Sequence, residues 1–203
     1  MTAIVDYGVG NLFSLRSSFG FIGEKAAVTR DAEAIAAADR VVLPGVGAFG
    51  DAAEKLRQSG LDAAVKQAAA SGKPLLGICL GMQLLFERSF EYGEHAGLGL
   101  LGGEVVPMRG AIPKNLRIPH IGWNALHFER QHPIFKYVGE GEHVYFVHSY
   151  YAANCGESLV ATADYGLPLT AAAAAGNVVG CQFHPEKSGE VGMKILRGFC
   201  EMR

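Results

Sequence analysis

Short apolar runs alternate with helical patterns in the first part of the chain. The apolar runs have the length of strands, and they are Ala3–Asp6, Ala26–Thr29, Arg40–Leu43 and Leu75–Ile78. Between them lie segments with helical spacing, which begin at Asn11, at Asp31 and near residue 51; the last is interrupted near Ser59-Gly60. This repeated strand–helix–strand order predicts an α/β protein with a doubly wound, mostly parallel sheet flanked by helices.

The pattern changes between residues 98 and 147, where short strands and turns replace the helices. We predict strands at Glu104–Met108, Trp123–Phe128 and His143–Val147. Further strands are expected at Leu159–Ala163, Thr170–Ala175 and Val178–Cys181, before a closing helix over Val191–Met202. We interpret residues 98–147 as an antiparallel extension of the sheet, so the sheet is mixed and residues 1–203 form a single domain.

Glycine surrounds a cysteine at the end of the fourth apolar run. Cys79 stands between Gly77 and Gly81, and Met82 to Phe86 continue as one apolar side of a helix. A sharp strand-to-helix turn of this kind presents its central side chain at the sheet edge and needs glycine for space and for backbone freedom. The first N–H groups of the helix would favour a thiolate there, which makes Cys79 a candidate nucleophile. The alternative is a buried small apolar residue.

A base for this nucleophile is found near the C-terminus. His184 follows the strand-like run Val178–Cys181, and Glu186 stands two residues further on. Cysteine, histidine and a carboxylate together give the nucleophile, base and orienting group of acyl transfer. His148, at the end of another predicted strand, is the competing candidate, and we prefer His184 because Glu186 follows it.

The turn after the third strand supplies a second chemical motif. In Pro44-Gly45-Val46-Gly47 two glycines flank one residue, so a peptide plane can turn inward and present an N–H group. Because the ends of parallel strands share one edge, this turn should lie near Cys79. We predict that it forms an oxyanion hole with the N–H of Leu80. The alternative is an ordinary strand-to-helix turn.

Composition removes several other function classes. The net charge of −2 gives no basic surface for nucleic acid or for anionic membranes. A dinucleotide-binding G-x-G-x-x-G motif that begins at Gly8 would need a third glycine at position 13, which is Phe13. The four cysteines form no metal-ligand spacing, so we expect no metal and no cofactor. No signal peptide precedes the first strand and no run reaches membrane-spanning length. We therefore expect a reducing, cytoplasmic location, which suits a working thiol.

These motifs together resemble a known family. Gly77-Ile78-Cys79-Leu80-Gly81-Met82-Gln83 with His184-Pro185-Glu186 is similar to the class I, triad-type glutamine amidotransferases, which have a flavodoxin-like fold. Within that family the chain most resembles the glutaminase subunits of imidazole glycerol phosphate synthase. The segments that carry this narrower resemblance, within a match from about residue 3 to residue 199, are Asp6–Leu12, Leu43–Phe49, Ile118–Asn124 and Phe183–Ser188.

The resemblance implies a function and a set of roles. Cys79, His184 and Glu186 would hydrolyse glutamine to glutamate and ammonia. The ammonia would pass to a cyclase subunit with a (β/α)8 barrel, in a heterodimer that makes imidazole glycerol phosphate and AICAR in histidine biosynthesis. Substrate binding is implied for Gly45, Val46, Gly47, Leu80, Gln83, Glu91, Ser149 and Tyr150. Contact with the partner is implied for Asn11, Trp123 and Lys187, although Asn11 also fits a helix N-cap and Trp123 also fits a core position.

Some alternatives stay open at this level. Glu94 competes with Glu91 for the amine of glutamine, and Arg117 stands where the family usually has lysine. The chain could serve another amidotransferase, for pyridoxal phosphate, anthranilate or purine synthesis. A cysteine peptidase or a non-catalytic regulator on the same fold is the alternative from a different class.

Overall fold

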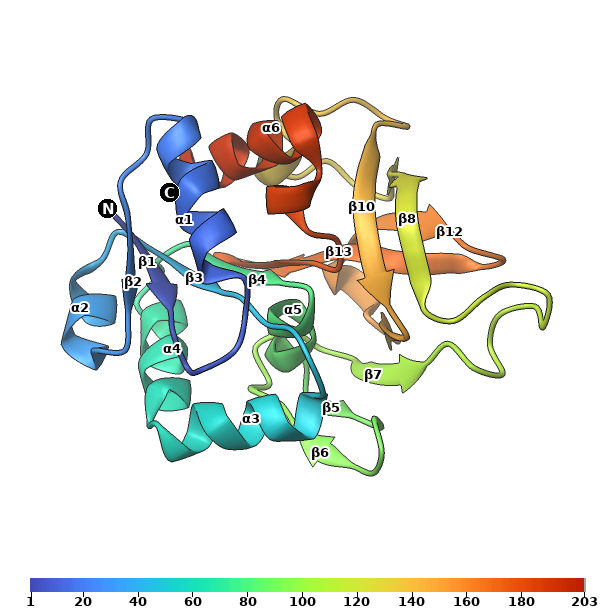
Figure 1. Ribbon diagram of the computed structural model, residues 1–203, viewed down its shortest axis with the longest axis horizontal. Coiled ribbons are helices and arrows are strands. Elements are labelled where there is room, and N and C mark those ends of the chain that lie inside the picture. Colours follow the sequence, from blue (N-terminus) through green and yellow to red (C-terminus); the bar gives the residue numbers. More distant parts are fainter. Residues whose placement is uncertain (203) are drawn as a thin grey trace.

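The structure, a computed structural model, describes residues 1–202 and is built on an eight-stranded sheet (Figure 1). The strand order is β2-β1-β3-β4-β14-β13-β12-β9. The parallel strands are β1 (Thr2–Val5), β2 (Ala26–Thr29), β3 (Arg40–Leu43), β4 (Leu75–Ile78) and β14 (Val178–Cys181). The antiparallel strands are β13 (Pro168–Ala175), β12 (Leu159–Asp164) and β9 (His127–Phe128). The predicted mixed, mostly parallel sheet is confirmed.

Helices cover both faces of this sheet. In Figure 1, α1 (Leu12–Phe21) and α6 (Gly189–Cys200) lie above it, and the others lie below: α2 (Ala32–Ala37), α3 (Phe49–Gln58), α4 (Leu61–Ala70) and α5 (Leu80–Leu85). Successive side chains of a strand point to opposite faces, so Ile4 packs with α1 and α6, whereas Ala3 and Val5 pack with the lower helices. Burial on both faces explains why β1, β3, β4 and β14 are mostly apolar, whereas the edge strand β2 is only half-buried.

Local signals define several helix ends. The Asp31 side chain accepts a hydrogen bond from the Glu33 N–H at 2.9 Å and caps α2. Gly60, with φ 70°, adopts the left-handed conformation that separates α3 from α4, at the predicted break. Asn11 occupies the N-cap position of α1, but its side chain makes no capping hydrogen bond.

The middle of the chain differs from the prediction: residues 98–147 do not extend the main sheet, apart from β9, and the predicted strand over 123–128 is divided. Two small sheets form beside the main one: β11 (Tyr150–Ala153), β7 (Glu104–Pro107), β5 (Arg88–Ser89) and β6 (His95–Ala96) in the first, and β10 (His143–His148) and β8 (His120–Ala125) in the second. The predicted strand is divided at Leu126, whose backbone bonds to Glu142 and Gly141 at 3.0 and 2.9 Å, in the turn before β10. Only the part beyond Leu126, β9, joins the main sheet.

Strand β13 contains a run of alanines that intrinsic preference would not place in a strand. Ala171–Ala174 are all buried, and the strand is paired on both sides, with β12 and β14. The small side chains fit a position where the sheet is covered closely on each face, so tertiary packing decides the conformation.

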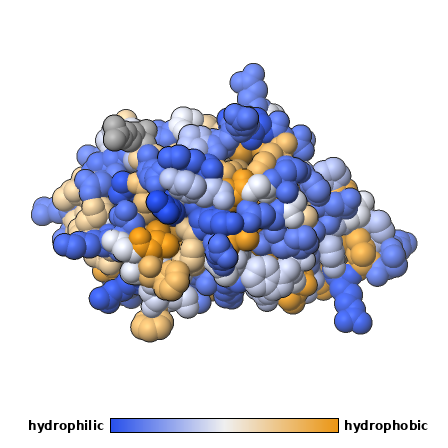
Figure 2. Space-filling model, turned by 90° about the horizontal axis from the view of Figure 1, so that it is seen from above, coloured by the Kyte–Doolittle hydropathy of each residue, from blue (hydrophilic) through white to orange (hydrophobic). Residues whose placement is uncertain are grey.

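The surface on the side of α1 and α6 is mainly hydrophilic. Figure 2 shows that apolar side chains form separate small patches there, and Phe13 and Phe21 of α1 are the largest exposed apolar residues of that helix. Within residues 1–202, every helix is too short or too polar to cross a bilayer.

Candidate active site

Cys79 occupies a strained elbow between β4 and α5. Its φ is 54° and its ψ is −112°, values that a residue with a side chain rarely adopts. The glycines on either side leave space rather than backbone freedom: a Cβ on Gly81 would lie 1.8 Å from the Leu43 carbonyl oxygen, and one on Gly77 would lie 2.7 Å from Leu85 Cδ1. The predicted need for space is confirmed, whereas the predicted need for backbone freedom is wrong, because neither glycine has a positive φ.

The parallel pairing of β14 with β4 brings the C-terminal motif to the elbow. Cys181 pairs with Ile78, and the Cys181 carbonyl accepts a hydrogen bond from the Cys79 N–H at 2.8 Å. His184 then leaves the strand, and its N–H donates to the Tyr145 carbonyl of β10 at 2.9 Å. Two residues separated by about a hundred positions in the sequence are thereby held at one pocket.

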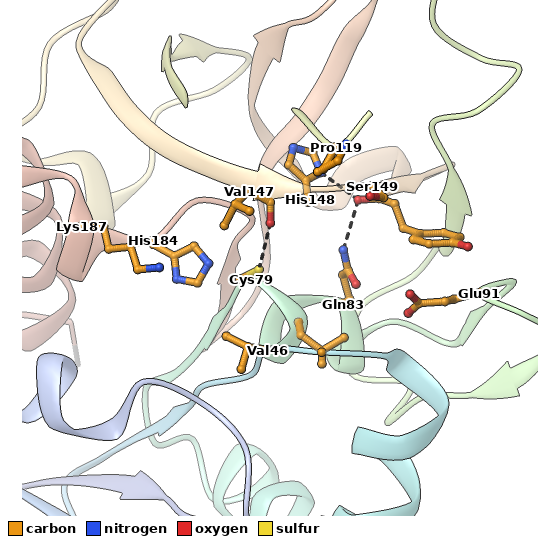
Figure 3. Close-up of a pocket in the computed structure, with 13 residues that line it drawn as sticks. Val46, Cys79, Gln83, Glu91, Pro119, Val147, His148, Ser149, His184 and Lys187 are labelled. Atoms are coloured by element: carbon orange, nitrogen blue, oxygen red, sulfur yellow. Dashed lines mark hydrogen bonds between the residues drawn. The ribbon is translucent and has the colours of Figure 1, made fainter. Parts of the chain in front are cut away.

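His184 and Glu186 form a buried pair beside Cys79. The Nδ1 of His184 lies 2.8 Å from the Glu186 Oε1, and both side chains are almost completely buried. Burial alone would lower the pKa of His184, but its interactions with Cys79 and with Glu186 outweigh this effect and raise the pKa to about 9. In Figure 3 the imidazole ring is directed at Cys79. The ring therefore holds a proton at neutral pH next to the sulfur.

His148 lies at the same pocket but in a different environment. Its Nδ1 is 2.8 Å from the Tyr150 carbonyl oxygen, and its Nε2 is 3.1 Å from Nδ1 of His120. Burial is the main reason why its pKa falls to about 4, so this ring is neutral at neutral pH. Both ring nitrogens are engaged within the protein, which favours His184 as the base.

Cys79, His184 and His148 line a pocket of about 390 Å³, the size of a small-molecule site. Figure 3 shows Val46 on one side of Cys79, Val147 and Ser149 on the other, and Gln83 and Glu91 at the far end. The lining residues include every predicted substrate-binding residue except Gly45, namely Val46, Gly47, Leu80, Gln83, Glu91, Ser149 and Tyr150.

The loop after β3 lies directly against the elbow. Position 45 requires glycine because the loop backbone lies close to the elbow: a Cβ there would lie 2.7 Å from the Gly81 backbone nitrogen. The Tyr7 hydroxyl donates to the Pro44 carbonyl at 2.7 Å and holds the start of the loop. Gly47 has φ 101° and Val46 is 43% exposed, so the freedom of the loop is confined to its second half.

Glu91 and Glu94 have separate positions. Glu91 Oε2 accepts a hydrogen bond from the Phe49 N–H at 2.6 Å, which caps α3 and fixes the end of the loop, and burial raises its pKa. Glu94 forms an ion pair with Arg88 at 3.3 Å and does not line the pocket. Of the two, Glu91 is the carboxylate available to a ligand amine.

Gln83 and the turn after β10 form the far wall. The Nε2 of Gln83 donates to the Tyr150 carbonyl at 3.2 Å and to Oε1 of Gln182 at 2.9 Å. Both of its N–H groups are then occupied, so it presents only its carbonyl oxygen to the pocket, an acceptor suited to an ammonium group. The Ser149 carbonyl is likewise occupied, by the Met108 N–H at 3.0 Å.

Two of the three residues expected to face a partner lie together. Trp123 is 55% exposed and packs edge-on against Tyr145 with 6.0 Å between ring centroids, and the Lys187 ammonium lies 5.7 Å from the same Tyr145 ring. Lys187 also lines the pocket. Asn11 is half-buried at the start of α1 and makes no side-chain contact with this group among the residues described.

Three residues at the site escaped the sequence analysis. Gln182 approaches the sulfur of Cys79, His120 pairs with His148, and Pro119 lines the pocket. Pro119 and His120 lie inside a segment that carried the family resemblance, and Gln182 directly precedes another. The neighbours of all three come from other strands, so spacing along the chain gave no sign of a role. Arg117, where the family usually has lysine, is exposed, and its carbonyl accepts a hydrogen bond from the Tyr165 hydroxyl at 2.9 Å.

Comparison with known proteins agrees with this geometry. The family model described as “Glutamine amidotransferase class-I” matches residues 3–202. The chain belongs to this family. Among solved structures, one titled as a glutamine amidotransferase superposes with a TM-score of 0.76 at 21% identity, covering 98% of this chain and 97% of the other. PurLQS from Thermotoga maritima gives a TM-score of 0.77 at 21% identity, with coverage of 98% and 96%. These two matches show the class I amidotransferase fold.

Full-length relatives are more specific. A protein of Wolinella succinogenes named imidazole glycerol phosphate synthase subunit HisH is 48% identical over 204 residues, covering all of both chains. A protein of Lactococcus lactis with the same name is 47% identical over 199 residues, which is 98% of this chain and 96% of the other. The counterpart from Bacillus cereus is 49% identical over 199 residues, with 98% and 93% covered. This class I amidotransferase is therefore similar in sequence to that one kind of subunit over its whole length.

Proposed function

We propose that this class I amidotransferase is the glutaminase subunit of an imidazole glycerol phosphate synthase. It hydrolyses glutamine to glutamate and ammonia, and the ammonia passes to a cyclase subunit that makes imidazole glycerol phosphate and AICAR in histidine biosynthesis. The observation that carries the proposal is the meeting of Cys79 and His184 at one pocket, with Glu186 hydrogen-bonded to the His184 ring, in a chain about 48% identical to subunits of that enzyme.

The first half of the reaction forms a thioester. The sulfur of Cys79 attacks the side-chain amide carbon of glutamine, and the carbonyl oxygen becomes negatively charged. The N–H of Leu80 stabilises this oxyanion together with an N–H from the Val46–Gly47 part of the loop. His184 gives its proton to the amide nitrogen, the carbon–nitrogen bond breaks, and ammonia leaves. Glu186 holds the ring of His184 in orientation throughout.

The second half regenerates the enzyme. A water molecule gives a proton to His184 and attacks the thioester carbon, the carbon–sulfur bond breaks, and glutamate leaves while the sulfur returns to the thiolate beside the protonated ring. Gln83 and Glu91 would bind the α-ammonium group of glutamine, because each presents an oxygen acceptor to the far end of the pocket. Ser149 and Tyr150 complete that wall beside them.

Ammonia released into water would be protonated and lost, so the product requires a partner. The proposed partner is a cyclase subunit with a (β/α)8 barrel, which forms a heterodimer with this chain. Exposed apolar side chains beside the pocket support this proposal: Trp123 and Ile121 of β8 are 55% and 59% exposed. Lys187 connects this surface to the pocket. A cytoplasmic location stays part of the same proposal.

The decisive experiment measures glutamate release by the chain alone and with candidate acceptor subunits. We expect slow glutamate release by the chain alone, and both faster release and imidazole glycerol phosphate formation with the cyclase subunit. Activation by an acceptor subunit of pyridoxal phosphate, anthranilate or purine synthesis instead would assign the chain to that pathway. A glutamine-like electrophile should label Cys79, whereas a cysteine peptidase would not react with it.

A further inference from the structure

A chain of buried amide groups connects the far wall of the pocket to the sulfur of Cys79. The Gln182 side chain is completely buried, and its Nε2 lies 3.7 Å from the Cys79 sulfur. Its Oε1 accepts a hydrogen bond from Gln83 Nε2 at 2.9 Å, and the same Gln83 nitrogen lies 3.2 Å from the Tyr150 carbonyl oxygen. The sulfur, two side-chain amides and one backbone carbonyl thus form a single line of contacts.

The direction of every bond in this line follows from its last member. The Tyr150 carbonyl can only accept, so Gln83 must turn its NH₂ group toward it. Gln83 therefore also donates to Gln182, which must present its oxygen to Gln83 and its NH₂ group to the sulfur. Turning either amide over would place two donors or two acceptors against each other in a buried site, which is costly.

The Tyr150 carbonyl is itself held by a second chain. His148 donates to it from Nδ1, so the Nε2 of the neutral His148 ring accepts, and His120 must donate from its own Nδ1. Both lone pairs of the Tyr150 oxygen are then used, by Gln83 and by His148. Hydrogen bonds from Gln83 and from His148 therefore hold the Tyr150 oxygen in place, and this oxygen sets the orientation of the Gln83 and Gln182 amides.

The strand register explains why Gln182 reaches the nucleophile. Cys181 pairs with Ile78 in the parallel ladder of β14 and β4, so the next residue of each strand lies at the same level of the sheet edge. These next residues are Gln182 and Cys79. The Gln182 N–H donates to the Ala171 carbonyl of β13 at 2.8 Å, which anchors its backbone.

We propose that Gln182 is a further catalytic residue, which donates an N–H to the sulfur of Cys79 and stabilises its negative charge before attack and again when the thioester is cleaved. The inference rests on Cys79 as the nucleophile. A donor in a buried site is effective because no reorganisation of water is needed when the charge appears. Gln182 thereby links the Gln83 wall, where the substrate amine would bind, to the reacting atom.

The test compares Gln182→Leu with the wild type and with Thr162→Val. Thr162 is also buried and polar, but its hydroxyl contacts Glu129 at 3.2 Å, away from the pocket. The first readout is the rate of Cys79 alkylation by iodoacetamide against pH, measured on the Cys79 peptide by mass spectrometry. The second is kcat and KM for glutamine in the complex with the cyclase subunit.

Loss of the donor should raise the midpoint of the alkylation profile by about one pH unit. It should lower kcat roughly ten- to a hundredfold, with a smaller change in KM. Thr162→Val should change neither the midpoint nor kcat. A midpoint equal to that of the wild type, with or without a fall in kcat, would show that Gln182 only fills space and would overturn the proposal.

A second variant covers the case in which Gln182→Leu does not fold. Gln182→Glu has nearly the same shape and keeps an acceptor for Gln83, but it places an oxygen against the sulfur. Its alkylation midpoint should rise at least as far as expected for the leucine variant, and an unchanged midpoint would again overturn the proposal. If alkylated Cys79 still supported glutamine hydrolysis, the nucleophile assignment would fail instead, which separates the two hypotheses.

Discussion

Two buried histidines lie beside the same pocket and have opposite protonation states. His184 faces Glu186 and Cys79, and its pKa is raised to about 9. His148 faces a backbone carbonyl and the His120 ring, and its pKa is lowered to about 4. Burial favours the neutral ring in both places, so the neighbouring groups determine the protonation state. The acidic side chains beside His184 keep its ring protonated, whereas the neutral groups beside His148 do not. Proton transfer therefore belongs to the histidine with acidic neighbours.

The most severe way to disturb this arrangement is to remove the sulfur. Cys79→Ser should lower glutamine hydrolysis by roughly 10⁴-fold or more, because a serine hydroxyl is far less ionised at neutral pH. Ammonium salts should still support the cyclase reaction in the complex, since that chemistry lies in the other subunit. Glutamate release and ammonium-dependent product formation are the measurements, and full glutaminase activity in the variant would contradict the nucleophile assignment.

Substitution of each histidine by asparagine tests the comparison directly. His184→Asn should be about as damaging as the loss of Cys79, because no other group at the site can carry the proton. His148→Asn should cost about tenfold or less, since the asparagine NH₂ can replace the Nδ1 donor to the Tyr150 carbonyl. Steady-state kinetics of the two complexes would decide, and a larger loss in the His148 variant would reverse the assignment of the base.

Loss of the orienting carboxylate should have a smaller effect. Glu186→Gln should be roughly ten- to a hundredfold milder than His184→Asn, because an orienting group is less costly to lose than a base. The pKa of His184 should fall, since the Glu186 charge helps to raise it. NMR titration of the His184 ring provides the check. An unchanged pKa would mean that Cys79 alone maintains the charge.

Binding of the partner should raise the rate of glutamine hydrolysis by about a hundred- to a thousandfold, which is the typical effect of one oxyanion donor. Tyr7 holds Pro44 and the Gly81 backbone confines Gly45, so only the Val46–Gly47 peptide is free to turn. We expect slow glutamate release by the free chain and faster release by the complex with acceptor ligand, through a population shift of this peptide. Equal rates for the chain, the complex and the ligated complex would show that the donor is already in place.

The smallest expected effect is on stability against pH. His148 has a lowered pKa, so its contribution is complete above its unfolded value near 6.5 and is lost as the pH falls toward 4. His184 has a raised pKa, so its contribution is complete below about 6.5 and is lost as the pH rises through about 9. Denaturant unfolding should show an acid-side loss that His148→Asn reduces and an alkaline-side loss that Glu186→Gln reduces. Parallel curves for variant and wild type would contradict this assignment.

The sequence predicted those parts of the fold that depend on local patterns. Four of the five parallel strands, β1, β3, β4 and β14, are largely buried apolar runs, and Asp31 and Gly60 mark helix ends by their own side-chain chemistry or backbone conformation. The separation of β8 from β9 was not predicted, because it depends on pairing with strands β10 and β12, which are distant in the sequence.

The candidate site divides in the same way. Cys79, His184 and Glu186 were found because the elbow glycines and the two-residue spacing are visible in the chain. Gln182 and His120 were missed, because the first matters through the register of β14 on β4 and the second through the pairing of His148 with His120 across β10 and β8. Sequence spacing contains no information about which residues a strand register places opposite each other.

The position of Trp123 has a practical consequence. It is the only tryptophan of the 203 residues, and it stacks edge-on against Tyr145, whose carbonyl accepts the His184 N–H. Its half-exposed indole is therefore a unique tryptophan fluorophore placed next to the strand end that holds His184. Emission from the unlabelled protein should shift to shorter wavelength when a binding subunit covers the ring, so association can be titrated optically without any added dye.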